Sequence, residues 1–183
     1  MSMLWSPDTY QKAIDFAARA HGEQQVPGKP YSYVVHISSV CMESMAAIAH
    51  GDVAHPDLAI QVALLHDVLE DTATTYLQVA VQFGQGVADG VAALTKNPDL
   101  PKDAQMQDSL QRILLQPSEI GMVKLADSIT NLQKPPAHWQ IAKIIRYLNE
   151  AEQIYQSLHG CNGFLAHRLK EKIDSYSQYV SQA

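Results

Sequence analysis

The sequence has few cysteines and no long apolar segment. Its two cysteines, Cys41 and Cys161, fit neither a metal-ligand spacing nor a disulfide framework. No run of 18 apolar residues is uninterrupted, so no transmembrane helix is expected. The first residues, MSMLWSPD, lack a basic segment followed by an apolar one, which argues against a signal peptide. These absences predict a cytoplasmic protein with reduced thiols and no membrane partner.

Basic residues are also scarce. The chain has 13 Lys and Arg against 19 Asp and Glu, a formal charge of −6 and a pI near 5.7. Polymeric nucleic acid is bound by basic surfaces, so we expect no such partner. A small phosphorylated ligand remains compatible with this charge, because a metal ion and a few local cations can bind one. The oligomeric state stays open.

No segment alternates polar and apolar residues over a useful length, so no strand is expected. Apolar residues at helical spacing predict helices instead, and all nine prolines fall in loops or first turns. The main helices are expected from Pro7 to about His21, His36 to about His50, Pro56 through Thr72, Asp103 through Leu115, Pro117 through Leu132, and His138 to His159. We therefore predict an all-α fold, a single compact multi-helix bundle over residues 1–183.

The stretch LLHDVLEDT, Leu64–Thr72, places His66, Asp67, Glu70 and Asp71 in an otherwise apolar run. On a continuous helix His66 would share a face with Glu70, and Asp67 with Asp71. The neighbours His66 and Asp67 would point about 100° apart. Three carboxylates and an imidazole in a buried helix are costly without a counter-charge, which a divalent cation supplies. The alternative is a helix end with solvated acids and one capped histidine.

Two other apolar segments carry polar residues of the same kind. His36 stands in YVVHISSV, and Asp127 stands in VKLADSITNL with Asn131 one helical turn later. Two imidazoles and two carboxylates suit manganese, iron or zinc. Such a cation lowers the pKa of a bound water, which Glu70 is placed to orient or deprotonate. Lys124, beside Asp127, is expected to contact a phosphate or to form an ion pair.

The order of His36, the His66-Asp67 pair and Asp127 is an H…HD…D pattern. On these residues the chain resembles the HD-domain metal-dependent phosphohydrolases, an all-helical superfamily. Within it, the chain is similar to the small alarmone hydrolases and the hydrolase half of RelA/SpoT-type enzymes, which remove the 3′-pyrophosphate of (p)ppGpp. The similar segments cover nearly the whole chain: AARAH at 17–21, PYSYVVH at 30–36, ALLHDVLEDT at 63–72, FG at 83–84, LPK at 100–102 and VKLADSITNL at 123–132.

The resemblance implies a role for each matching residue. The family binds one divalent cation, usually Mn²⁺, although Fe²⁺ and Zn²⁺ are also compatible with the donors. The implied metal ligands are His36, His66, Asp67 and Asp127. The residues implied to position the attacking water and assist proton transfer are Glu70 and Asp71. The residues implied to contact the nucleotide substrate are Asn131, Lys102, Lys143 and Tyr147.

The chain departs from the family pattern where the family contacts the nucleotide. A Q-x-R-K segment is replaced here by Gln24-Gln25-Val26-Pro27, and an arginine by Lys143. The segment at 24–27 therefore lacks two cations that the family has, and we expect weaker binding of a substrate as charged as ppGpp. Two further hypotheses therefore stay open: a phosphatase or nucleotidase acting on another nucleotide, such as NADPH or a 5′-nucleotide, and a non-catalytic sensor that binds metal and nucleotide.

Overall fold

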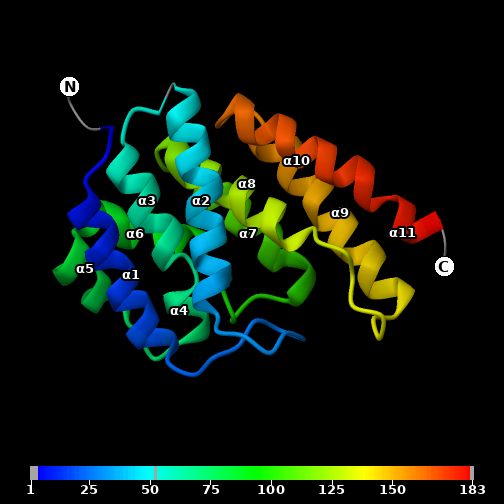
Figure 1. Cartoon of the computed structure of the whole chain (residues 1–183), viewed down its shortest axis with the longest axis horizontal. Helices are drawn as coiled ribbons and strands as arrows, with labels where there is room; N and C mark the ends of the chain where they lie inside the picture. Colours follow the sequence, from blue (N-terminus) through cyan, green and yellow to red (C-terminus); the bar gives the residue numbers. More distant parts are fainter. Residues whose placement is uncertain (1–3, 52, 182–183) are drawn as a thin grey trace.

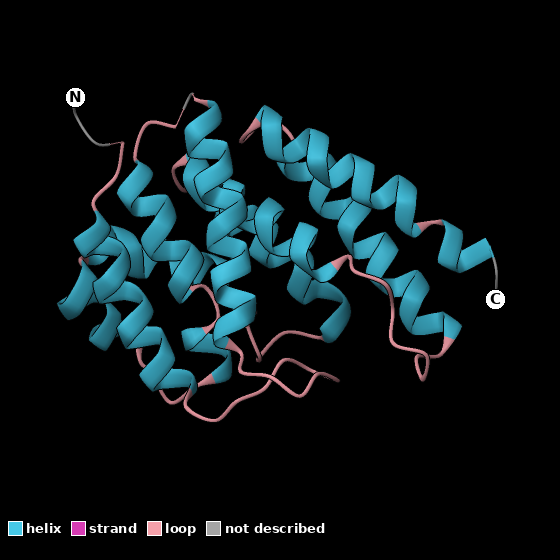
Figure 2. Ribbon diagram, viewed as in Figure 1, coloured by secondary structure: helices cyan, strands magenta, loops and turns pink. Residues whose placement is uncertain are grey.

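The computed structural model describes residues 4–51 and 53–181. Within them, helices joined by loops make up the fold, which confirms the predicted all-α class (Figure 2). The only pairing of extended backbone in these residues is an isolated bridge between Gln25 and Ser32. The helices are α1 Pro7–His21, α2 Val34–His50, α3 Pro56–Leu65, α4 Val68–Asp71, α5 Tyr76–Phe83, α6 Gln85–Leu94, α7 Lys102–Leu114, α8 Ser118–Asn131, α9 Ile141–Leu158, α10 Gly163–Tyr176 and α11 Gln178–Ser181. Among them, no helix is both long and apolar enough to cross a membrane.

Helix α8 lies at the centre of the bundle. It packs against α2, α3, α9 and α10, and Figure 1 shows it behind α2, between the α1–α3 side and the α9–α10 side. Its apolar side chains are almost wholly buried: Ile120, Met122, Val123, Leu125, Ala126 and Ile129. A polar residue on the same helix, such as Asp127, is therefore buried in the interior.

The helix starts follow local capping chemistry. Ser6 accepts a hydrogen bond from the Thr9 amide ahead of Pro7, and Asn162 accepts one from the Leu165 amide. Thr75 and Gln78 form a reciprocal capping box at the start of α5. These caps satisfy amide groups that a helix cannot satisfy itself.

Some predicted boundaries shift by up to three residues. Helix α2 begins at Val34 rather than His36, because Tyr33 already has helical backbone angles. Helix α9 begins at Ile141 rather than His138, because residues up to Trp139 continue the turn that Pro136 makes and Gln140 is extended. The effect on the site is to place His36 within the first turn of α2.

The predicted continuous helix through Leu64–Thr72 is wrong. Helix α3 ends at Leu65 and the single turn α4 begins at Val68, with Asp67 between them at φ −103° and ψ −1°. These angles lie at the edge of the right-handed helical region, away from the ideal α-helical values, and the helix is interrupted here. As a result the side chains of His66 and Asp67 meet, with His66 Nε2 2.9 Å from Asp67 Oδ2, where a continuous helix would point them about 100° apart.

Gly121 allows α8 to approach the turn after α9. A Cβ atom added to Gly121 would lie 2.4 Å from Cys161 Sγ and 3.0 Å from Cys161 Cβ. These separations are shorter than van der Waals contact, so the glycine is required by packing and not by its backbone angles.

We expect Gly121→Ala to lower the free energy of unfolding by ~1–3 kcal/mol, the usual cost of overpacking, although Ala is favoured over Gly within a helix. Urea denaturation measures this. The matched control is the same substitution in a Cys161→Ala background, where the removed sulfur leaves room and the cost should shrink. An equal cost in both backgrounds would contradict the packing explanation.

Candidate metal centre

Four of the predicted residues converge from three parts of the chain. His36 comes from the first turn of α2, His66 and Asp67 from the break between α3 and α4, and Asp127 from α8. His36 Nε2 lies 3.5 Å from Asp127 Oδ1 and 3.7 Å from Asp67 Oδ2. His66 Nε2 lies 2.9 Å from Asp67 Oδ2 and 3.9 Å from Asp127 Oδ1.

The donors fit a divalent cation. The ligand atoms of His36, His66 and Asp67 all lie within 4.8 Å of one another. His66 Nδ1 lies 2.9 Å from the Ala63 carbonyl, which places a proton on Nδ1 and leaves Nε2 as the ring atom directed at the carboxylates. This Nε2 atom is buried and makes no hydrogen bond with a described residue. A buried nitrogen without a partner, facing two carboxylates, matches the donor set of a borderline metal ion.

Electrostatics keeps both carboxylates ionised. Burial opposes the charged form of Asp67, but the neighbouring His66 lowers its pKa to about 2. Burial likewise opposes ionisation of Asp127, yet Lys124 and His36 hold its pKa well below the usual range. Burial disfavours a charged His66, whereas Asp67 and Asp127 raise its pKa to about 9, so a cation that binds at Nε2 has to displace a proton from this atom. The carboxylates are therefore ready to act as ligands, and their negative charge favours a cation between the side chains.

Each carboxylate is oriented by a neighbour. The Tyr33 hydroxyl donates to Asp67 Oδ2, and burial together with Asp67 raises the pKa of that phenol. Asn131 Nδ2 donates to Asp127 Oδ1 at 2.6 Å, and Lys124 Nζ lies 3.0 Å from Asp127 Oδ2. Lys124 thus forms the ion pair, one of its two expected roles. The part played by Tyr33 was missed, although its position three residues before His36 was a signal for it.

Glu70 and Asp71 are held away from the four converging residues by partners of their own. Glu70 Oε1 lies 3.2 Å from Lys96 Nζ, and Glu70 Oε2 accepts a hydrogen bond from the Lys96 amide at 3.0 Å. Asp71 Oδ2 accepts from Gln24 Nε2 at 3.0 Å, and Gln24 Oε1 lies 2.8 Å from His21 Nδ1. Both carboxylates are fixed by these contacts and line the cavity around the cluster.

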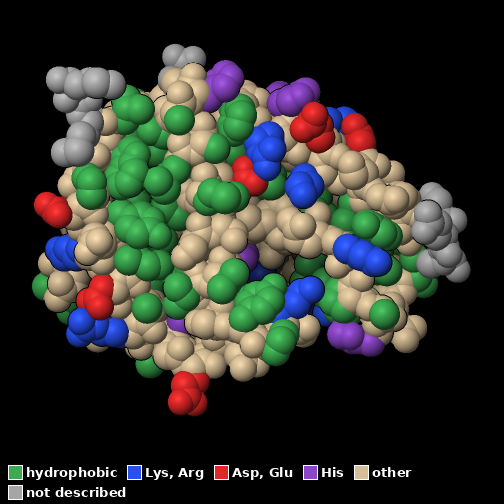
Figure 3. Space-filling model, in the orientation of Figure 1, with side chains coloured by type: hydrophobic (Ala, Val, Ile, Leu, Met, Phe, Trp, Pro, Cys, Tyr) green, Lys and Arg blue, Asp and Glu red, His purple; other side chains and the backbone are tan. Residues whose placement is uncertain are grey.

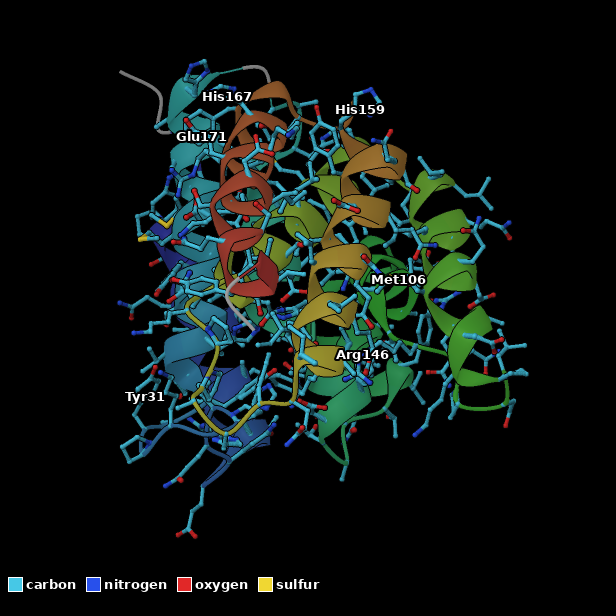
Figure 4. All side chains as sticks on the ribbon, turned by 90° about the vertical axis from the view of Figure 1, so that its right-hand side faces the viewer. Tyr31, Met106, Arg146, His159, His167 and Glu171 are labelled. Atoms are coloured by element: carbon cyan, nitrogen blue, oxygen red, sulfur yellow. The ribbon has the colours of Figure 1, made fainter. Side chains whose placement is uncertain are left out.

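Two adjoining cavities surround the cluster. The metal cavity, about 250 Å³, contains His36, His66, Asp67 and Asp127 together with Glu70, Asp71, Asn131 and Tyr147. The outer cavity, about 420 Å³, is lined by residues of the loops before α2 and after α8 and by residues of helices α2, α8 and α9. Val26, Pro27, His36, Asn131 and Tyr147 line both. The loop residue Tyr31 and Arg146, near the start of α9, both lie at the lower end of the molecule in Figure 4.

Two residues predicted to bind substrate lie outside both linings. Lys102 begins α7 and is exposed. Lys143 Nζ lies 4.0 Å from the ring centroid of Trp139, which itself lines the outer cavity. The structure thus brings together eight of the predicted site residues, leaves Lys143 beside the outer cavity and places Lys102 apart.

The family described as HD domain matches residues 13–165 of this chain. The chain belongs to the HD-domain family. It is 32% identical over 168 residues to the Mus musculus protein named guanosine-3′,5′-bis(diphosphate) 3′-pyrophosphohydrolase MESH1, a match that covers 87% of this chain and 90% of the relative. The Homo sapiens protein of that name is 32% identical over 167 residues, which cover 87% of this chain and 89% of the relative.

A solved structure has the same fold. It is described as a metazoan orthologue of SpoT that hydrolyses ppGpp, and it matches with a TM-score of 0.81 over 93% of this chain and 96% of that chain, at 24% identity. This HD-domain chain is therefore a phosphohydrolase related to ppGpp pyrophosphohydrolases, and the predicted resemblance is confirmed. The family implies a divalent metal ion, and the cluster of histidines and aspartates suited to one is present.

We expect Tyr33→Phe to weaken metal binding by about 10–100-fold, the usual effect of losing a hydrogen bond to a metal ligand. The ring stays in place while Asp67 loses the donor that orients it. Competition with a chromophoric chelator measures the affinity. The matched control is Tyr76→Phe, which removes the hydrogen bond to Asp89 far from the site. Equal affinity for the Tyr33 variant and the unsubstituted protein would contradict this role.

Proposed function

We propose that this chain removes the 3′-pyrophosphate of (p)ppGpp with the help of one divalent cation. Manganese is the first candidate, ahead of iron and zinc. The observation that carries the proposal is the convergence of four donors, His36, His66, Asp67 and Asp127, with two further carboxylates, Glu70 and Asp71, in the lining of the same cavity. The names of the relatives support (p)ppGpp as the substrate.

The four converging side chains would hold the cation, which supplies a Lewis acid for a phosphoryl oxygen and an activated water. Glu70 and Asp71 orient the attacking water and accept its proton. Lys96 fixes Glu70 and Gln24 fixes Asp71, so neither carboxylate has to reorganise when the substrate binds.

The remaining predicted residues divide by position. Tyr147 lines both cavities and is proposed to contact the nucleotide between them, whereas Asn131 positions Asp127 and faces the same ligand. Lys143, beside Trp139, is proposed to contact the substrate at the rim of the outer cavity. Lys102, which lines neither cavity, has no role in this proposal.

Hydrolysis of another phosphorylated nucleotide is the second candidate function. It is favoured by Val26 and Pro27, which line both cavities at the place where the RelA/SpoT-type pattern has two cations. A substrate with fewer charges needs fewer cations in that wall.

The first experiment is hydrolysis of ppGpp by the Mn²⁺-loaded protein, beside pppGpp, NADPH and 5′-nucleotides. We expect pyrophosphate release from ppGpp, abolished by Asp67→Ala because a metal ligand is lost, and retained by Asp89→Ala, which removes a carboxylate of α6 outside the site. Turnover of a different nucleotide alone would transfer the function to the second candidate. A metal-loaded protein inactive on the whole panel would refute both.

Glu70→Gln separates catalysis from metal binding. The amide preserves an acceptor for the Lys96 amide but cannot take a proton from water. We expect turnover to fall by at least about 100-fold, with metal content unchanged by elemental analysis. Full turnover in this variant would exclude Glu70 as the proton acceptor.

A further inference from the structure

The metal cavity is acidic. Its lining includes five carboxylates, Asp67, Glu70, Asp71, Asp127 and Glu150, and two lysines, Lys96 and Lys124. Both lysines are already engaged, Lys96 by Glu70 and Lys124 by Asp127. With a divalent cation present, this cavity provides a place for the reacting phosphoryl group but no spare cation for a second phosphate.

The outer cavity has the opposite balance. Lys29 and Lys134 line it, and neither side chain makes a hydrogen bond or ion pair with another described residue. The carboxylate among its described lining residues is Glu43, which is held by the guanidinium of Arg168, with Nε donating to Oε2 at 2.7 Å and Nη2 to Oε1 at 2.5 Å. Two lysines without a described side-chain partner therefore line a cavity in which the carboxylate of the described residues is neutralised.

The two loops that carry these lysines pack against each other. Gly28 precedes Lys29 and has φ +75°, and a Cβ atom added there would lie 3.8 Å from His138 Cε1 and 3.9 Å from Pro136 Cγ. The loop before α2 thus lies against the loop after α8. Figure 3 shows a hollow near the middle of this face with Lys or Arg side chains beside it.

We propose that Lys29 and Lys134 form a phosphate subsite that holds the end of a nucleotide remote from the scissile pyrophosphate. The inference rests on the proposed function and specifies its substrate class: nucleotides phosphorylated at two separate positions. Asn131 and Tyr147 line both cavities, so one ligand can extend from the metal cluster to the two lysines. Positive charge that is missing at Val26 and Pro27 is supplied instead by these neighbouring loop positions.

The test compares two substrates that differ only at the remote end, ppGpp and guanosine 3′-diphosphate. In the Lys29→Met/Lys134→Met variant we expect kcat/KM for ppGpp to fall about tenfold, because two exposed ion pairs together contribute about that factor. The value for guanosine 3′-diphosphate should stay within about twofold of the unsubstituted protein, since that compound cannot reach the subsite. The loss for ppGpp should shrink at high salt.

Two controls exclude trivial causes. Lys12→Met removes a lysine of α1 that lines neither cavity and donates to the Gln82 carbonyl, and it should leave both substrates unaffected. Lys29→Arg/Lys134→Arg keeps the charge and should restore the preference for ppGpp. An equal fall for both substrates in the methionine variant, or no fall for either, would overturn the subsite.

Failure of the proposed function is recognised separately. If the unsubstituted protein hydrolyses neither compound, the proposed hydrolase activity is wrong. Binding of ppGpp and of guanosine 3′-diphosphate to the Mn²⁺-loaded protein is then compared by calorimetry. Tighter binding of ppGpp that is lost in the methionine variant still supports the subsite. Equal dissociation constants of ppGpp for the unsubstituted protein and the methionine variant refute the subsite.

Discussion

Burial of ionised carboxylates beside a free imidazole nitrogen is the constraint on which this structure depends. Asp127 is carried inward by α8, whose neighbouring side chains form part of the core, and Asp67 is delivered to it by the break after α3. Charges in such a place are stable only with partners of opposite sign and with hydrogen bonds to every free oxygen. Lys124, Asn131 and Tyr33 provide part of that compensation, and the His66 ring, with Nε2 2.9 Å from Asp67 Oδ2, provides another part.

The same requirement links parts of the chain that are far apart in sequence. The loop before α2 contributes Gln24 and Tyr33, and the segment after α6 contributes Lys96. Each of these residues holds a carboxylate of the α3–α4 region by a single contact or a pair of contacts. Side chains oriented in this way lose little freedom when a ligand arrives, and that preorganisation is what a hydrolytic site requires.

Sequence patterns predicted the helices and the set of converging residues, because both depend on local periodicity and on residue type. They did not predict the break at His66-Asp67, since the apolar run continues on both sides of it and gives no stop signal. The partner Lys96 was equally hidden, because its contacts with Glu70 arise from tertiary packing. Lys102 matched a motif, yet it lines neither cavity. The position of α7 relative to the site depends on helix packing, which a motif does not specify.

The division of the site between core helices and loops has a consequence for evolution. The donors for the cation come from α2, α8 and the α3–α4 break, where each substitution disturbs the packed interior. The outer cavity is built largely from two exposed loops, whose residues tolerate exchange. A lineage with this architecture can therefore acquire a new ligand preference by drift in the loops while its reaction chemistry is inherited unchanged.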